Sequence, residues 1–198
     1  MLKDPFNWFP SPLFGTILGY TFLFGILIDS LLPRYLNPDQ KSEPVLTGDR
    51  ASFLSINAAE LLAILSGLTL RYFNLGVTST AAQYAGLIIM VAGFLLRDWA
   101  LWRLGRFFSR VVQIENGHQL ITNGPYRYLR HPAYTGMLMI FFGFLLGIGT
   151  WLGALLGLIL IGASVLYRIN IEEKVLAENF GNEYRAYIKR TWRIFPGF

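Results

Sequence analysis

The chain lacks cysteine altogether and has only two histidines, His118 and His131, among its 198 residues. Without cysteine it forms no disulfide bond and no thiolate metal site. A zinc site would need carboxylates to complete its ligand set, and the chain has no HExxH spacing. We therefore predict no metal centre.

Charge is also scarce: charged residues make up 15% of the chain, whereas a soluble domain carries about 25%. Hydrophobic residues reach 54%. This composition predicts an all-α integral membrane protein in one domain, residues 1–198, with three spans in 1–104 and the other elements in 105–198. Because a helix needs roughly 20 apolar residues to cross a bilayer, we expect five spans, at 12–32, 52–70, 80–104, 133–147 and 151–167.

The last two spans are predicted to form a helical hairpin that turns at 148–150. The fourth span has only about 15 residues, roughly 22 Å as a helix, and would fall short of the opposite face. Glycines spaced four apart, such as Gly143 and Gly147 or Gly149 and Gly153, would let helices approach closely. After the hairpin we expect two short amphipathic helices on the cytoplasmic surface, 171–180 and 182–190, separated at Gly181.

Basic residues are distributed unequally between the two ends of these spans. Placing 105–132 in the cytoplasm leaves fifteen of the 17 Lys and Arg residues on that side, all but Lys3 and Arg71. The positive-inside rule then predicts an outside N-terminus and a cytoplasmic C-terminus. These arginines flank spans, where they meet lipid headgroups, and form no basic strip typical of nucleic-acid binding. The compact chain favours a prokaryotic inner membrane, and its oligomeric state stays open.

Two polar segments stand out among the apolar spans. HQLITNGPYRYLRHPAYTG runs from His118 to Gly136, and EEKVLAENFGNEYRAYIKRTWRIFP runs from Glu172 to Pro196. Their elements GPYRYxRHPxYxG, EE, FGxEYxxY and RxxP, in this order, resemble the isoprenylcysteine carboxyl methyltransferase family. This group of integral-membrane methyltransferases also includes phospholipid N-methyltransferases. The resemblance covers about the C-terminal 80 residues.

The resemblance implies a cofactor, S-adenosylmethionine, held at the cytoplasmic face by the polar segment and the end of the last span. The residues agree physically. Pro132 suits the first position of a helix, so His131 would be at the N-cap of the fourth span. The helix amides at that position favour an anion such as the cofactor's carboxylate. Arg130 would add positive charge. Aromatic faces for the cationic sulfonium would come from Tyr126, Tyr128 and Tyr134.

The implied cofactor-binding set therefore combines the polar segment with the paired acids, which would accept hydrogen bonds from the cofactor's amino group or ribose hydroxyls. It comprises Gln113, His118, Leu120, Gly124, Tyr126, Arg130, His131, Tyr134, Glu172 and Glu173. The candidate catalytic residues are Arg97, Arg168 and Glu172.

Ordinary structural roles stay open for the same residues. Tyrosines and arginines at the end of a span are common membrane anchors, and His131 would also serve as a simple helix cap. Glu60, Arg97 and Asp98 lie inside spans, where charges are costly and usually pair or face a cavity. Arg97 would then either bind an acceptor carboxylate or form a structural pair, for example with Glu60.

The predicted reaction is methyl transfer to a lipophilic acceptor from the bilayer, foremost the α-carboxylate of a prenylated cysteine. That carboxylate is ionised near pH 7 and needs no general base. A phospholipid amine, the alternative acceptor, must first lose a proton. Two other classes stay open: an NADPH-dependent enzyme similar to membrane sterol reductases, which share the closing RxxP pattern, and a non-catalytic membrane scaffold.

Overall fold

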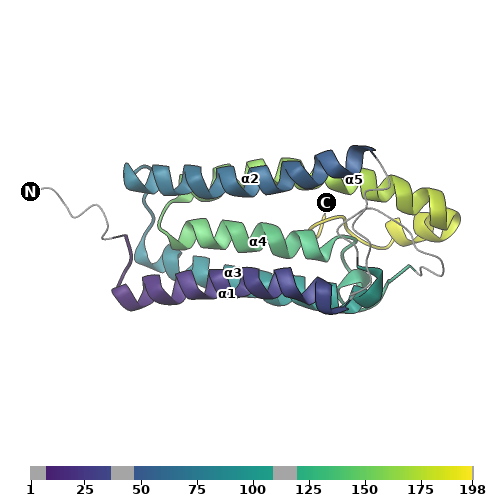
Figure 1. Ribbon diagram of the computed structural model, residues 1–198, viewed down its shortest axis with the longest axis horizontal. Helices are drawn as coiled ribbons and strands as arrows, with labels where there is room; N and C mark the ends of the chain where they lie inside the picture. Colours follow the sequence, from purple (N-terminus) through teal and green to yellow (C-terminus); the bar gives the residue numbers. More distant parts are fainter. Residues whose placement is uncertain (1–7, 37–46, 109–119, 198) are drawn as a thin grey trace, which may run out of the picture.

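A computed structural model describes residues 8–36, 47–108 and 120–197 and shows a bundle of long helices (Figure 1). The elements are α1 (Pro12–Leu36), α2 (Thr47–Tyr72), α3 (Thr80–Leu104), α4 (Pro132–Gly147) and α5 (Trp151–Ile188), with short 3-10 helices η1 (Gly105–Phe107) and η2 (Gly124–Arg127). Each predicted span falls within one helix. The predicted all-helical membrane fold is thereby confirmed, with four helices long and apolar enough to cross a bilayer and α4 shorter.

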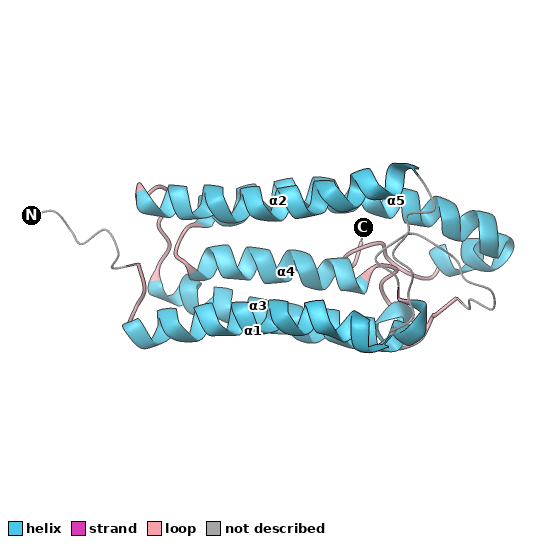
Figure 2. Ribbon diagram, viewed as in Figure 1, coloured by secondary structure: helices cyan, strands magenta, loops and turns pink. Residues whose placement is uncertain are grey.

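The helices lie in three layers, which Figures 1 and 2 show from the side. α1 packs on α3, α2 packs on α5, and α4 lies between these two pairs. Most of α4 is buried. By contrast, α1 and α2 leave large apolar side chains exposed, among them Leu13, Leu23, Phe24, Leu27, Leu54, Leu61 and Leu65. Such a surface suits contact with lipid, because the bilayer core is itself apolar.

Local sequence signals explain where three of the helices begin. The Ser79 hydroxyl accepts a hydrogen bond from the Ala82 amide at 3.3 Å and caps α3. The Thr150 hydroxyl accepts from the Gly153 amide at 3.1 Å and caps α5. Pro132 occupies the first turn of α4, as predicted. Ser and Thr are preferred at N-caps because their oxygen satisfies an otherwise unpaired amide.

Glycines bring α3 and α4 into backbone contact. A Cβ placed at Gly143 would lie 2.5 Å from the Gly86 carbonyl oxygen, and one placed at Gly93 would lie 2.8 Å from the Gly136 carbonyl oxygen. The two glycines on each helix are seven residues apart, so they share one helix face. Only glycine allows this approach, which confirms the prediction for Gly143 and adds its partners on α3.

The short helix α4 ends against polar side chains rather than in water. Arg71 donates from Nε to the Ile148 carbonyl at 3.2 Å, and Gln83 donates from Nε2 to the Gly147 carbonyl at 3.3 Å. With 16 residues, α4 is about 24 Å long, less than the roughly 30 Å of a hydrocarbon core. These donors satisfy carbonyls that lipid would leave unpaired.

The structure corrects the predicted tail. The expected helix 171–180 is not separate, because α5 continues without a break from Trp151 to a kink at Gly181, where φ is 49°. No glycine or proline interrupts the sequence between Gly162 and Gly181, so nothing ends the helix earlier. The predicted break at Gly181 is confirmed, and the chain beyond it forms a second helical segment that ends at Ile188.

We expect Gly143→Ala to destabilise the protein by about 1–3 kcal/mol, because its methyl group would collide with the α3 backbone. Thermal unfolding in detergent micelles measures this. The matched control is Gly162→Ala, where a Cβ meets nothing within 4 Å and where helix propensity predicts no loss. Equal unfolding temperatures for the two variants would contradict the packing argument.

Candidate active site at the end of the bundle

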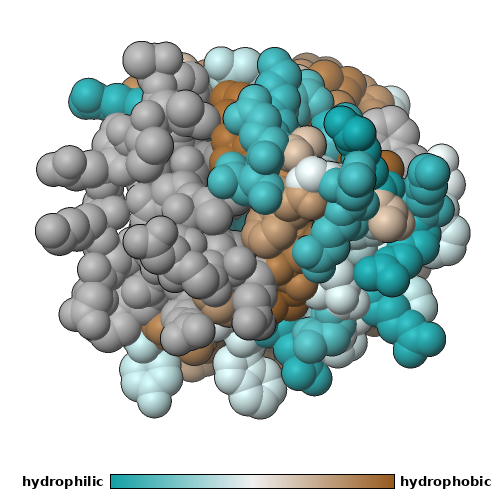
Figure 3. Space-filling model, turned by 90° about the vertical axis from the view of Figure 1, so that its right-hand side faces the viewer, coloured by the Kyte–Doolittle hydropathy of each residue, from teal (hydrophilic) through white to brown (hydrophobic). Residues whose placement is uncertain are grey.

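Polar residues gather at the end of the bundle where α3 stops, α4 starts and α5 extends beyond its neighbours (Figure 1). Figure 3 views the molecule from this end and shows hydrophilic side chains around a narrow apolar strip. The C-terminal segment crosses the start of α4. There the Arg130 amide donates to the Trp192 carbonyl at 2.7 Å and the His131 amide to the Arg193 carbonyl at 3.1 Å. This pairing covers the N-terminus of α4 and buries His131.

Glu173 is the centre of an ion-pair cluster that ties the tail to the polar segment. Its Oε1 accepts from Arg130 Nε at 3.0 Å and lies 3.3 Å from His131 Nε2. Its Oε2 accepts from Arg193 Nη2 at 2.7 Å. Arg130 also donates to the Thr191 carbonyl at 2.7 Å. One carboxylate therefore holds together α5, the C-terminal segment and the residues between η2 and α4.

Glu172, the neighbouring carboxylate, faces the membrane helices. It accepts hydrogen bonds from the Tyr134 hydroxyl and, at 3.2 Å, from Arg168 Nε. Its Oε2 lies 3.6 Å from His131 Nδ1. Arg168, only 3% exposed, reaches onward to the Ser52 hydroxyl of α2 at 2.9 Å. The two glutamates therefore have different partners and share His131 between them.

These carboxylates bear on the prediction that the N-terminus of α4 binds an anion. His131 is the N-cap residue, as predicted, but its side chain makes no capping hydrogen bond. Both ring nitrogens instead face carboxylates, Nδ1 facing Glu172 and Nε2 facing Glu173. The positive end of the helix dipole favours negative charge, and the protein's own glutamates supply that charge at this position.

Arg97 lies apart from the glutamates, on the membrane side of the site. Its Nε donates to Asp29 Oδ1 at 2.5 Å and its Nη2 to Asp29 Oδ2 at 3.2 Å, while Nη1 donates to the Ala133 carbonyl at 2.9 Å. The structural pair that we named as an example, Arg97 with Glu60, is corrected to Arg97 with Asp29. Glu60 lies close enough to interact electrostatically with both.

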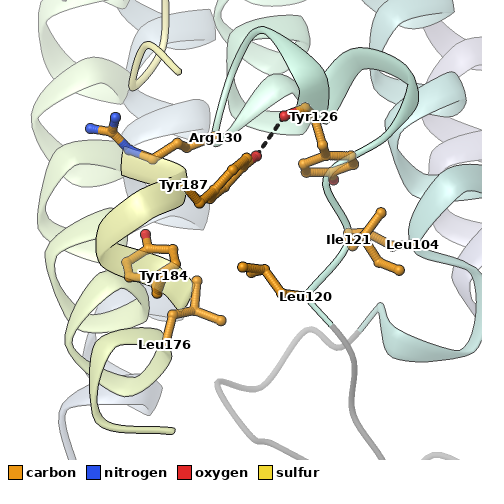
Figure 4. Close-up of a pocket in the computed structure, with 8 residues that line it drawn as sticks. All are labelled: Leu104, Leu120, Ile121, Tyr126, Arg130, Leu176, Tyr184 and Tyr187. Atoms are coloured by element: carbon orange, nitrogen blue, oxygen red, sulfur yellow. Dashed lines mark hydrogen bonds between the residues drawn. The ribbon is translucent and has the colours of Figure 1, made fainter. Parts of the chain in front are cut away.

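A pocket adjoins the ion-pair cluster at Arg130. About 410 Å³ of empty space, part of it open to solvent, lies between the tail of α5 and the chain around η2 (Figure 4). The Tyr187 hydroxyl donates to the Tyr126 carbonyl at 2.7 Å and closes one side. Burial raises the pKa of the Tyr126 hydroxyl well above its ordinary value. The lining residues are Leu104, Leu120, Ile121, Tyr126, Arg130, Leu176, Tyr184 and Tyr187.

Tyr184 has an unusual environment in this lining. The residue is 1% exposed, and its hydroxyl has no hydrogen-bond partner among the described residues. A buried polar group without a partner costs about 1–3 kcal/mol. Native proteins rarely retain such a group, and this hydroxyl is free to bond a ligand atom at this wall of the pocket.

Most of the predicted site residues come together. The polar cluster contains Arg130, His131, Tyr134, Arg168, Glu172 and Glu173, and the pocket contains Leu120, Tyr126 and again Arg130. Gly124 begins η2 with a φ of 60°, close to the side chain of Arg103. Tyr128 is 57% exposed and is not part of either group. Gln113 and His118 lie outside the described residues.

Sequence reasoning missed several residues of the site. Tyr184 and Tyr187 are three apart in the quoted FGNEYRAY motif, and this helical spacing would have placed both on one face. Arg193 lies in the quoted RxxP element. Asp29 and Ser52 come from α1 and α2, and no motif in the sequence points to them.

This fold and this site define a multi-pass helical membrane protein with a buried polar cluster beside a pocket at one end. Residues 81–183, just over half of the chain, match the family model described as phospholipid methyltransferase. The chain belongs to the phospholipid methyltransferase family. Its predicted resemblance to isoprenylcysteine carboxyl methyltransferases is also confirmed by individual relatives.

One such relative is the probable protein-S-isoprenylcysteine O-methyltransferase of rice (Oryza sativa subsp. indica), which is 34% identical over 116 residues, 58% of this chain and 61% of that protein. Another is the protein-S-isoprenylcysteine O-methyltransferase of Dictyostelium discoideum, 32% identical over 149 residues, 71% of this chain and 60% of that protein. The chain thus spans about 60% of the length of these relatives. Both are eukaryotic and lend no support to the predicted prokaryotic inner membrane.

A solved structure has the same fold. The eukaryotic intramembrane Ras methyltransferase, isoprenylcysteine carboxyl methyltransferase, matches with a TM-score of 0.60 and 21% sequence identity, over 91% of this chain and 66% of that one. Together with the four long apolar helices, this match supports a multi-pass integral membrane protein.

We expect Glu173→Gln to destabilise the ligand-free protein by about 1–3 kcal/mol, because it removes the charge that Arg130 and Arg193 share. Thermal unfolding in detergent measures the loss. Limited proteolysis should also cut the variant faster near Thr191, where the cluster holds the C-terminal segment. Glu178→Gln is the control, since that side chain is exposed on the same helix. A Glu173 variant as stable as the control would contradict the role of the cluster.

Proposed function

We propose that this protein transfers a methyl group from S-adenosylmethionine to a lipophilic acceptor, foremost the α-carboxylate of a prenylated cysteine. The observation that carries the proposal is the pocket that joins the Arg130–Glu173 pair at the end of the bundle. The family match and the names of the relatives support methyl transfer as the reaction class. The exposed apolar helices beside the site support an acceptor that arrives through lipid.

The residues present fit the proposed cofactor. The pocket is partly open to solvent and lies directly beside Arg130. Its leucines and tyrosines suit a purine ring, and the unpartnered Tyr184 hydroxyl would both donate and accept. Nη2 of Arg130 makes no bond within the described part of the chain and would take a carboxylate. Gln113 and His118 remain predicted members of this site.

The charges of the cofactor's sulfur and of the acceptor determine which groups the methyl transfer needs. When bound, S-adenosylmethionine supplies an electrophilic methyl group on a cationic sulfur, which leaves as a neutral thioether. Tyr134, held by Glu172 and Arg168, would present its ring to that cation. The prenylcysteine carboxylate is already ionised and attacks without a general base. The residues of the chain would therefore act by alignment and electrostatics.

Arg97 is the proposed binding group for the acceptor carboxylate. It sits beside the first turn of α4, bonded to the Ala133 carbonyl, one residue from Tyr134. A guanidinium has five N–H donors, and three of them are used in the described structure. Two donors remain for an acceptor oxygen.

A phospholipid amine is the second candidate acceptor, because the matching family model is described as phospholipid methyltransferase. An amine must lose a proton before or during attack. Glu60, which lies near Arg97, would be available to accept it.

We further propose that the site end of the bundle faces the cytoplasm. Arg130, Arg168 and Arg193 lie at that end, and Arg71 lies at the other, against the α4–α5 turn. This distribution follows the positive-inside rule.

The deciding experiment is calorimetric titration of the purified full chain in detergent with S-adenosylhomocysteine and, in parallel, with NADPH. We expect micromolar binding of S-adenosylhomocysteine and none of NADPH. Labelled methyl transfer from S-adenosylmethionine to farnesylcysteine and to phosphatidylethanolamine then identifies the acceptor. Binding of NADPH alone would assign the chain to the reductase class. Binding of S-adenosylhomocysteine with no transfer to any acceptor would favour a scaffold, and binding of neither would contradict the proposed site.

Variants of Tyr184 and Tyr187 test whether the pocket binds the cofactor. We expect Tyr184→Phe to raise the stability of the ligand-free protein by about 1 kcal/mol, because it removes a buried hydroxyl that has no partner. The same variant should weaken S-adenosylhomocysteine binding about 5–10-fold, the loss of one hydrogen bond.

Tyr187→Phe is the matched comparison, since its hydroxyl donates to the Tyr126 carbonyl. It should lower stability instead. Unfolding temperatures and calorimetry on both variants measure these changes. If Tyr184→Phe binds S-adenosylhomocysteine as the parent does, the Tyr184 hydroxyl does not contact the cofactor.

A further inference from the structure

The counter-ion of Arg97 is Asp29 on α1. Of the helices, α1 lies farthest in the sequence from the motifs at 118–136 and 172–196. Asp29 binds the guanidinium through two oxygens, Oδ1 to Nε and Oδ2 to Nη2. A bidentate carboxylate fixes both the position and the plane of a guanidinium. Residues 81–183, which match the family model, include Arg97 but not Asp29.

The contact between α1 and α3 explains how Asp29 and Arg97 come together. A Cβ at Gly25 would collide with the ring of Phe94, so glycine allows the two helices to approach closely at this level. Asp29 lies four residues after Gly25, one helical turn onward, and Arg97 lies three residues after Phe94. The close approach therefore brings the Asp29 carboxylate within hydrogen-bond distance of Arg97.

Arg97 has other acidic groups within electrostatic reach. Glu60 on α2 and Asp98 beside it on α3 both interact with it. One oxygen of Asp98 is buried without a hydrogen-bond partner among the described residues. In a bilayer a guanidinium needs a partner, so without Asp29 it would turn toward one of these acids. Tyr134 also faces it electrostatically from α4.

We propose that Asp29 is a positioning residue that holds Arg97 against the start of α4 and keeps its two remaining N–H donors available for the acceptor carboxylate. The inference rests on the proposed function, because it concerns the acceptor half of that site. Asp29 occupies Nε and one N–H of Nη2, and the Ala133 carbonyl occupies one N–H of Nη1. One N–H on each terminal nitrogen is left, the arrangement that a second carboxylate would bind.

The test is steady-state methyl transfer to farnesylcysteine by the full chain in lipid nanodiscs. Asp29→Asn should raise the acceptor KM about tenfold, the equivalent of about 1.4 kcal/mol, with a smaller change in kcat. The affinity for S-adenosylhomocysteine should stay as in the parent, because Asp29 does not touch the pocket or the glutamate pair. Asp29→Glu retains the charge but moves it by one methylene, and its KM should fall between those of the parent and Asp29→Asn.

Asp98→Asn is the matched control. It removes the same charge from the same surroundings, but Asp98 makes no hydrogen bond to Arg97 in the described structure. Its KM should stay near that of the parent. An Asp29→Asn variant with the same KM as this control would overturn the inference, and so would a lower KM, which would make Asp29 a competitor of the acceptor.

Two further results separate this inference from the proposed function. A parent protein that neither binds S-adenosylhomocysteine nor transfers methyl groups overturns the proposed function, and the inference fails with it. A parent that does both while Asp29 variants match Asp98→Asn overturns the inference alone. If Asp29→Asn does not fold, an Asp29→Glu variant with the parent's KM overturns it as well.

Discussion

The backbone contact between α3 and α4 is the constraint on which the site depends. Because Gly86 and Gly93 face Gly143 and Gly136, the backbone of α4 lies directly against the backbone of α3 at these positions. Arg97 follows Gly93 by one turn on the same face of α3, so its guanidinium reaches the Ala133 carbonyl in the first turn of α4. A bulkier interface would separate the two helices and break this contact. The packing therefore places the arginine beside the first turn of α4, one residue from Tyr134.

The adjacent glutamates divide the site into two halves. Glu173 binds Arg130 and Arg193, which belong to the polar segment and the tail. Glu172 binds Tyr134 and Arg168, which belong to the membrane helices. Successive residues on a helix point about 100° apart, so the adjacent side chains of Glu172 and Glu173 reach two different sets of partners. His131 contacts both carboxylates. A change in the position or charge of one glutamate would therefore act on the histidine that the other glutamate also contacts.

The sequence predicted the helices and the polar cluster because both depend on local or closely spaced signals. Apolar runs of about 20 residues define spans, and the quoted motifs contain His131, Tyr134, Glu172 and Glu173. The same signals did not predict that α5 continues past Tyr167, because a polar sequence without glycine or proline is compatible with either a longer helix or a new one. Asp29 was missed because a single acid in an apolar span has no local pattern. Its partner is 68 residues away, and only the packing of α1 on α3 joins them.

The origin of each residue also bears on which acceptor the protein uses. The family match covers residues 81–183, and this range holds the polar segment, both glutamates and Arg97. Asp29 and Ser52, which hold Arg97 and Arg168, come from α1 and α2, outside that range. These two helices also carry much of the exposed apolar surface through which a lipid would approach. The residues of the proposed cofactor site and Arg97 thus lie in the range that matches the family model, whereas Asp29 and Ser52, which support Arg97 and Arg168, lie outside it. Under the proposed function, acceptor selectivity would depend on α1 and α2, and a relative's acceptor would apply to this chain only where these helices correspond.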